Sequence, residues 1–171
     1  VIMLLLVTFI GWVVVRYSAT YLDGERRQGR FTALLCATLA CVLMVVSAGN
    51  LFQLAVAWIA TSLFLHNLLL FYPERIAAQR AARKKFVAAR IGDLSLLVAA
   101  GVLAYGYATT DIARILAEAR LGEGGAYAVP AAVLIALAAI LKSAQFPMHG
   151  WLTEVMEAPT PVSALLHAGV I

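Results

Sequence analysis

Leu141-Lys142-Ser143-Ala144-Gln145-Phe146-Pro147 is an apolar stretch that carries one lysine and ends on a proline. A charged side chain in hydrocarbon costs several kcal/mol, so a lysine at membrane depth usually faces the protein interior and serves a function. A proline removes a backbone donor and clashes with the preceding turn, so we expect a helix break at Pro147. Broken membrane helices are tolerated where the freed backbone lines a protein or water cavity. The stretch therefore predicts an ion path that includes Lys142.

The composition of the whole chain is that of an integral membrane protein. Of its 171 residues, 63% are hydrophobic and only 13% are charged, whereas soluble domains average about 45–50% apolar and about 25% charged residues. We therefore predict an all-α fold, a polytopic bundle of transmembrane helices that forms a single domain over residues 1–171.

About six transmembrane spans are predicted. The apolar segments cover residues 1–22, 31–46, 51–71, 86–107, 126–146 and 160 onward. After Pro147, the residues Trp151, Leu152, Val155 and Met156 continue an apolar stripe at helical spacing, so we interpret the fifth segment as one span broken at that proline. Because the chain begins and ends inside apolar runs, we expect it to be the central fragment of a longer subunit.

Basic residues gather between the apolar segments and account for much of the net charge of +4. The predicted loop 72–85 holds five of them against the single acid Glu74, namely Arg75, Arg80, Arg83, Lys84 and Lys85. By the positive-inside rule this loop is cytoplasmic, which predicts a multi-pass protein of the cell inner membrane. The basic residues are explained by this orientation, so we expect contact with the lipid bilayer and none with nucleic acid.

A short helix on the membrane surface is predicted within the polar connection 108–126. Asp111 is suited to cap its N-terminus. Apolar residues then recur at helical spacing, at Ile112, Ile115, Leu116 and Ala119. Such an amphipathic pattern is typical of a helix that lies along the membrane surface.

The sequence has no motif of soluble enzyme chemistry. It contains no phosphate-binding glycine loop, no Cys/His metal cluster and no nucleophile elbow. We expect no catalytic centre and no bound metal or cofactor in this chain. Whether the chain belongs to a larger enzyme complex stays open at this point.

Two interpretations of Lys142 compete. A long side chain can reach the membrane surface, which would be easy if the helix ended at Pro147, only ~7 Å away at 1.5 Å per residue. The apolar stripe after Pro147 instead places Lys142 near the middle of an interrupted span. Removal from water disfavours a charged ammonium group, so a lysine there could bind and release protons. We favour this second interpretation.

Three further ionisable groups lie in apolar segments. His167 is of the residue type that titrates nearest neutrality and suits a proton relay, although a histidine with a purely structural role is the alternative. Asp93 follows Arg90 by three residues, so the two share a helix face, either as part of an ion path or as an interfacial pair. His66 is more often structural in such a setting, with a role in the ion path as the alternative.

Two motifs, one around Lys142 and one around His167, resemble those of a known superfamily. They read Lys142-Ser143-Ala144-Gln145-Phe146-Pro147-Met148-His149-Gly150-Trp151-Leu152 and Ala158-Pro159-Thr160-Pro161-Val162-Ser163-Ala164-Leu165-Leu166-His167-Ala168. They resemble the signature of the proton-conducting membrane subunits of respiratory complex I and of cation/proton antiporters, closest to the NuoL-like branch. Arg90-Ile91-Gly92-Asp93 is similar to that branch as well.

The resemblance implies roles for single residues. Lys142 would be the central proton-binding group, His167 the link to the next half-channel, and Asp93 an acid near the path by which protons reach the lysine. The superfamily carries Trp-Glu where this chain has Trp58-Ile59, so the glutamate that pairs with the lysine is missing. Asp93 or His66 is our hypothesis for a substitute.

A second resemblance indicates a particular branch of this superfamily. The residues from Trp58 to His66 and from Leu69 to Arg75 are similar to DabB-type subunits, the membrane subunits of energy-coupled inorganic-carbon accumulation complexes. This implies a DabA-like cytoplasmic partner, a zinc protein that resembles a β-carbonic anhydrase, and zinc bound by the partner. The alternatives are a proton-pumping NuoL-like subunit of NADH–quinone oxidoreductase and a cation/proton antiporter subunit, each with other membrane subunits as partners.

Overall fold

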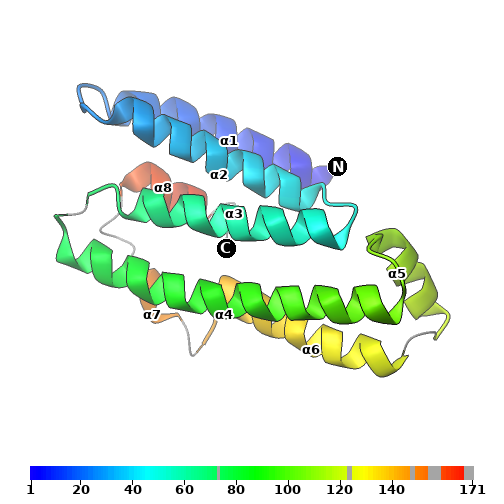
Figure 1. The fold of residues 1–171 in the computed structure, drawn as a ribbon. Helices are drawn as coiled ribbons and strands as arrows, with labels where there is room; N and C mark the ends of the chain where they lie inside the picture. The colour runs from blue at the N-terminus through cyan, green and yellow to red at the C-terminus, as the bar shows by residue number, and fades with distance from the viewer. Residues whose placement is uncertain (73, 123–124, 147–148, 154–158, 168–171) are drawn as a thin grey trace.

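Figure 1 shows a computed structural model of the chain, which describes residues 1–171 except 73, 123–124, 147–148, 154–158 and 168–171. The regular structure of the described residues is helical, which confirms the all-α prediction. The helices are α1 (Ile2–Tyr21), α2 (Gln28–Val46), α3 (Leu51–Leu69), α4 (Ile76–Gly106), α5 (Ile112–Arg120), α6 (Gly125–Lys142), α7 (Gly150–Thr153) and α8 (Thr160–Leu165).

The long helices lie side by side along a common direction, with α3 and α4 in the middle of the bundle (Figure 1). Helix α2 packs between α1 and α3, α3 packs on α4, and α4 packs on α6. The short helix α8 lies against α1, and α7 lies against α4. Residues on facing sides of α3, α4 and α6 are therefore brought together although they are far apart in the sequence.

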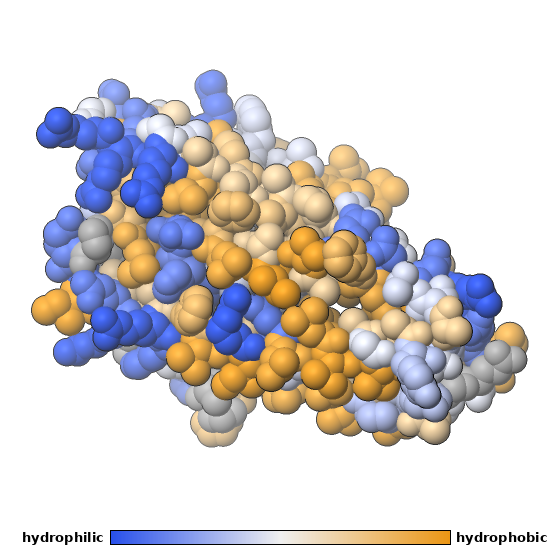
Figure 2. Space-filling view, in the orientation of Figure 1, coloured by the Kyte–Doolittle hydropathy of each residue, from blue (hydrophilic) through white to orange (hydrophobic). Residues whose placement is uncertain are grey.

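Within the part of the chain that the structure describes, five helices are long and apolar enough to cross a membrane, namely α1, α2, α3, residues Ala78–Gly106 of α4, and α6. Figure 2 shows the corresponding surface, a hydrophobic zone across the middle of the molecule with hydrophilic side chains at both ends. The chain is thus a multi-pass membrane protein. Of the predicted sixth span, the structure describes the short helix α8 as its ordered start.

The predicted loop 72–85 is corrected by the structure, because most of it is helical. Helix α4 begins at Ile76 and runs for 31 residues to Gly106, well before the expected start at Phe86. The segment is rich in Ala, Arg, Lys and Gln, which all have high helix propensity. Its alanines Ala78, Ala81 and Ala82 are buried against the bundle, so a packed face begins inside the stretch that charge alone marked as a loop.

The interruption of the fifth span starts earlier than Pro147, which itself lies outside the described residues. Helix α6 ends at Lys142, and Ala144 adopts a left-handed backbone with φ of 50°. The amide of Gln145 donates to the carbonyl of Ile140 at 3.3 Å, which is the pattern of a Schellman C-cap. The next helix begins at Gly150. Lys142 is therefore the last residue of a helix and not the middle of a continuous one.

The helix predicted within the connection 108–126 is present as α5, and backbone hydrogen bonds hold it against the start of α3. Its position on the membrane surface stays a prediction. The Asp111 side chain accepts a hydrogen bond from the amide of Arg114 at 2.9 Å, as expected of an N-cap. The amide of Leu51 donates to the carbonyl of Thr110 at 2.9 Å. Ile115 is buried while Leu116 is 54% exposed, so one apolar side faces the bundle and another remains outside.

The contact between α4 and α6 gives a stability prediction. A methyl group added at Gly106, the last residue of α4, would lie 2.6 Å from the Tyr127 ring and 2.8 Å from its Cβ. Overpacking of this kind typically costs about 1–3 kcal/mol. We expect Gly106→Ala to lower the thermal unfolding midpoint of the detergent-solubilised protein, measured by intrinsic fluorescence.

Gly101 in the same helix is the matched control, because a methyl group there meets no atom within 4 Å. Gly101→Ala should leave the midpoint unchanged or raise it, since alanine has the higher helix propensity by about 1 kcal/mol. Equal midpoints for the two variants would contradict the close α4–α6 packing at Gly106.

Candidate functional site

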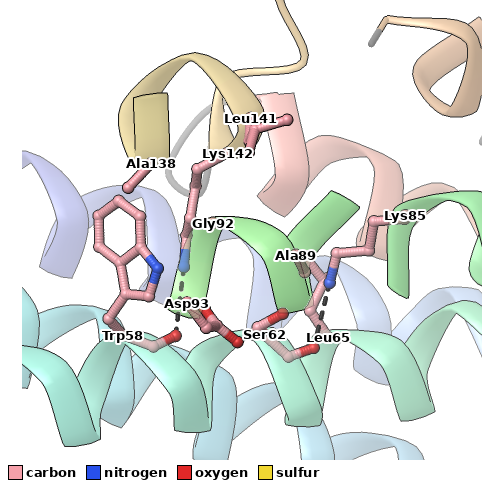
Figure 3. A pocket seen from close by; sticks show the side chains of 10 residues that line it. All are labelled: Trp58, Ser62, Leu65, Lys85, Ala89, Gly92, Asp93, Ala138, Leu141 and Lys142. Atoms are coloured by element: carbon pink, nitrogen blue, oxygen red, sulfur yellow. Dashed lines mark hydrogen bonds between the residues drawn. The ribbon is translucent and has the colours of Figure 1, made fainter. Parts of the chain in front are cut away.

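A cavity lies between α3, α4 and α6, near the middle of α3 and α4 (Figure 3). The space that the centre of a water-sized sphere can occupy is ≈ 30 Å³. It is lined by Trp58, Ser62, Leu65, Lys85, Ala89, Gly92, Asp93, Ala138, Leu141 and Lys142. Since about 10–15 Å³ of such space suffices for one water molecule, the cavity has room for about two.

Lys142 reaches into this cavity from the last turn of α6. Its Nζ donates to the backbone carbonyl of Trp58 at 3.3 Å and lies 4.2 Å from the centre of the Trp58 ring. Tryptophan is the aromatic side chain that attracts a cation most strongly, by about 2 kcal/mol when the pair is desolvated. Within the described part of the chain, Lys142 forms no ion pair. Trp58 is therefore its direct partner, through both ring and backbone.

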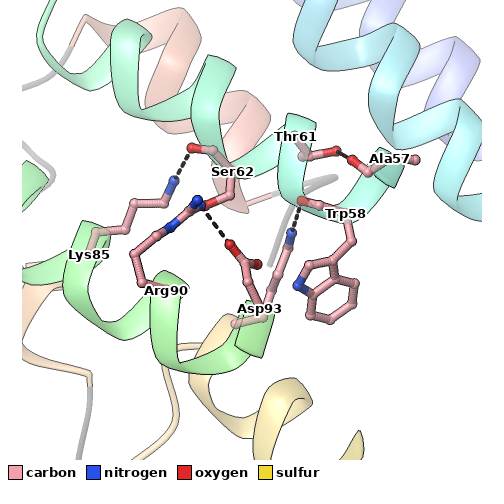
Figure 4. A network of polar contacts seen from close by, with 8 residues as sticks. Ala57, Trp58, Thr61, Ser62, Lys85, Arg90 and Asp93 are labelled. Carbon is pink, nitrogen blue, oxygen red and sulfur yellow. Dashed lines mark hydrogen bonds and ion pairs between the residues drawn. The ribbon is translucent and has the colours of Figure 1, made fainter. Parts of the chain in front are cut away.

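Asp93 supplies the carboxylate of the cavity and is only 5% exposed. Its Oδ2 lies 2.6 Å from Nη2 of Arg90, one turn earlier in α4 (Figure 4). The Trp58 side chain also lies beside the carboxylate, yet neither Asp93 oxygen has a donor in hydrogen-bond geometry. The negative charge of Asp93 is thus paired with Arg90 through Oδ2, while Oδ1 faces the cavity region without a hydrogen-bond donor from the described residues.

The buried Lys85 was missed as a site residue by the sequence interpretation, which counted it among the loop charges. It is 7% exposed, and its Nζ donates to the carbonyl of Ser62 at 3.1 Å (Figure 4). The signal that could have found it is the spacing of small residues at Ala78, Ala81 or Ala82, Ala88 or Ala89, and Gly92. These positions share a helix face with Lys85; on that face Lys85 contacts α3 and Gly92 faces α6.

The two histidines named from the sequence do not line the cavity. His66 packs on the ring of Phe86, with ring centres 5.0 Å apart, and its Nδ1 is buried without a hydrogen-bond partner. His167 lies just beyond α8, and its side chain is exposed. The structure thus brings Lys142 and Asp93 together around one cavity and leaves both histidines outside it; the relay role of His167 stays a prediction.

This arrangement is suited to proton exchange and poorly suited to metal binding. Two amines, one carboxylate and room for water lie between three membrane-length helices, where each group can pass a proton to a neighbour through water. The described residues contain no group of three or more His, Cys, Asp or Glu side chains close enough to hold a metal ion.

Two known protein families match different parts of this chain. Residues 48–171 match the family described as NADH:quinone oxidoreductase/Mrp antiporter, TM. Residues 1–32 match the family described as NADH-Ubiquinone oxidoreductase (complex I), chain 5 N-terminus. The two matches lie in the same order along this chain and together cover most of it.

Individual relatives fall into three groups. The chain is 48% identical to the probable inorganic carbon transporter subunit DabB of Hydrogenovibrio crunogenus, over 99% of this chain and 33% of that protein. It is 35% identical to the chloroplastic NAD(P)H-quinone oxidoreductase subunit 5 of Cryptomeria japonica, over 99% of this chain and 24% of that protein. A chain in the structure of the Mrp complex from Dietzia sp. aligns with a TM-score of 0.89 and 36% identity, over 98% of this chain and 19% of that one. The chain spans about a third of the length of its DabB relatives.

The Arg90–Asp93 pair gives a second stability prediction. Removing one partner of a fully buried ion pair costs about 3–5 kcal/mol, and we expect about 1–3 kcal/mol for Asp93→Asn because the Arg90 side chain is 34% exposed. The measurement is the thermal unfolding midpoint in detergent.

The Arg114–Glu118 pair on α5 is the matched control, at 2.8 Å with the Arg114 side chain 67% exposed. Exposed pairs contribute about 0–1 kcal/mol, so Glu118→Gln should leave the midpoint nearly unchanged. An Asp93→Asn variant as stable as Glu118→Gln would show that the buried pair does not stabilise the fold.

Proposed function

The chain belongs to the NADH:quinone oxidoreductase/Mrp antiporter transmembrane family, and we propose that it is part of the cation-conducting membrane subunit of an energy-coupled inorganic-carbon accumulation complex. The cation is a proton, and its central binding group is Lys142. The single observation that carries this proposal is the position of the Lys142 amine, at the end of an interrupted helix and inside a cavity shared with Asp93.

The conduction step follows from the groups around the cavity. The Lys142 amine takes up a proton and is then held by the Trp58 carbonyl and ring. A neutral partner stabilises the ammonium less than a carboxylate would, so the proton leaves again more readily. Asp93, whose Oδ2 is paired with Arg90 and whose Oδ1 has no hydrogen-bond partner among the described residues, holds water next to the amine. Proton transfer between Lys142 and that water moves charge along the cavity without any redox centre.

The inorganic-carbon branch is favoured by the position after Trp58. Ile59 occupies the place where the resemblance to complex I and antiporter subunits implies a glutamate. The DabB protein of Hydrogenovibrio crunogenus is also more similar to this chain, at 48% identity, than the chloroplastic subunit 5 of Cryptomeria japonica, at 35%. Trp58, rather than Asp93 or His66 alone, takes the place of the missing acid as the direct contact of Lys142.

The proposed partner is a DabA-like cytoplasmic zinc protein that resembles a β-carbonic anhydrase. Proton flow through the membrane subunit would drive one-way hydration of carbon dioxide to bicarbonate by this partner, and zinc would be bound there. The membrane is the cell inner membrane, with the connection after α3 and the basic start of α4 on the cytoplasmic side. The cluster of Arg80, Arg83 and Lys84 at that end supports this orientation.

The alternative is a proton-pumping subunit of a quinone oxidoreductase or an antiporter subunit. It is supported by the alignment with the Mrp complex at a TM-score of 0.89. The two functions differ in what drives or is driven by the proton, so a transport measurement separates them.

The experiment measures accumulation of ¹⁴C-labelled inorganic carbon in cells that express the full-length subunit with its genomic neighbour. We expect accumulation that an uncoupler abolishes and that falls at least tenfold in Lys142→Met, because methionine keeps the length of the side chain but cannot bind a proton. Arg16→Met, in the second half of α1 and not among the residues that line the cavity, is the control and should accumulate carbon like the wild type. Accumulation that resists the uncoupler, or NADH-driven proton pumping without carbon uptake, would refute the proposal.

The role of Trp58 gives a separate prediction. Trp58→Leu removes the ring that faces Lys142, and we expect uptake to fall on the order of tenfold, since a desolvated cation–π contact is worth about 2 kcal/mol. Trp58→Phe keeps an aromatic face and should fall less. Trp12→Leu, at a position 62% exposed on α1, should leave uptake unchanged; if Trp58→Leu behaved like Trp12→Leu, the ring would have no part in conduction.

A further inference from the structure

Lys85 is a buried amine to which the conduction step above assigns no role. It comes from α4, close to the start of the membrane-length part of that helix, and is 7% exposed. Its Nζ crosses to α3 and donates to the carbonyl of Ser62 at 3.1 Å. Burial of an ammonium group without an acidic partner is costly, so a lysine in this place calls for a function.

Lys85 and Lys142 make the same kind of contact with α3, since the Nζ of each donates to a backbone carbonyl of that helix. Lys142 donates to the carbonyl of Trp58, and Lys85 donates to the carbonyl of Ser62, one helical turn further on. Four residues of α-helix advance by roughly 6 Å, so the two amines, from different helices, sit on successive turns of the same helix. Both line the same cavity, on opposite sides of Asp93 (Figure 3).

The charges around the cavity do not balance if both lysines are protonated. Among the described residues, the charged and titratable groups that face Lys85 are His66 on α3, Arg90 and Asp93 on α4, and Lys142 on α6; the described helix α7, which also packs on α4, contains none. The carboxylate within this described set, Asp93, is already paired with Arg90. Two ammonium groups this close in a poorly solvated space repel each other strongly. Protonation of both amines at the same time is therefore disfavoured.

We propose that Lys85 is a second proton-binding group of the cavity and shares one proton with Lys142. In the transfer step, an N–H bond of the Lys85 ammonium breaks as the proton passes to a cavity water. That water in turn gives a proton to the neutral Lys142 amine, where a new N–H bond forms. The cavity has room for about two water molecules, and the Asp93 Oδ1 atom, which has no hydrogen-bond donor among the described residues, orients them. This inference rests on the proposed function and names the group that exchanges protons with Lys142.

The test compares Lys85→Arg, Lys85→His and Lys85→Met in the full-length complex, by uncoupler-sensitive uptake of labelled inorganic carbon as a function of external pH. Arginine keeps the positive charge and a donor for Ser62 but does not release its proton, so we expect at least a tenfold loss, as in Lys85→Met. Histidine can titrate, so Lys85→His should retain more uptake than either, with its optimum at lower pH than the wild type. Assembly of each variant is verified by co-purification with the partner and by its unfolding midpoint.

The neighbouring exposed Lys84 provides the control, and Lys84→Arg should transport like the wild type. If Lys85 only anchors α4 to α3, Lys85→Arg will transport within about twofold of the wild type, and the inference is wrong. It is equally wrong if an assembled Lys85→His is as inactive as Lys85→Met. A wild-type complex without uncoupler-sensitive uptake would instead refute the proposed function, and this inference with it.

Discussion

An ammonium group removed from water needs compensating contacts, and the centre of this protein is arranged around that requirement. Lys142 lies where α6 ends, and the Trp58 carbonyl and ring on α3 provide its contacts. Those contacts exist because α3, α4 and α6 pack directly on one another. Gly92 of α4 faces α6, where an added Cβ would meet the Ala138 carbonyl oxygen and the Leu141 Cβ at 3.5 Å, an ordinary van der Waals contact. The packing of the three helices thus supplies the contacts that replace water around the Lys142 ammonium group.

The long helix α4 joins the two ends of this centre. Its first turns carry the basic residues of the hydrophilic end, its middle carries Arg90 and Asp93, and its last residue packs on Tyr127 of α6. Because the helix is continuous from Ile76, it carries Lys85 into the bundle instead of leaving it at the surface. A loop over the same residues would have allowed Lys85 to remain in water. The second buried amine is therefore a consequence of helix continuity.

Ile59 stands where the resemblance to complex I and antiporter subunits implies an acid, a difference that concerns the electrostatics of the site rather than its architecture. The backbone aligns with the Mrp complex chain at a TM-score of 0.89, although the direct partner of Lys142 is neutral. Cation–π attraction and a carbonyl dipole are weaker than an ion pair, and they do not themselves titrate. The charge of the cavity is then set by Lys85, Lys142, Arg90 and Asp93. In the proposed mechanism, the repulsion between the two lysines and the pairing of Arg90 with Asp93 control how many protons the cavity holds.

The sequence by itself determined the membrane class, the helical spans and the helix capped by Asp111, because hydropathy and capping are local properties. The cost of a charge in hydrocarbon also indicated Lys142 as a candidate site residue, and the structure places it in the cavity. The tertiary structure alone decided where α6 ends, since the left-handed Ala144 terminates it, and which groups surround Lys142. It also separated Asp93, which lines the cavity, from His66 and His167, which do not. Lys85 could not be assigned from charge patterns, since burial of a lysine depends on which helix face meets α3, and that is fixed only when the helices pack.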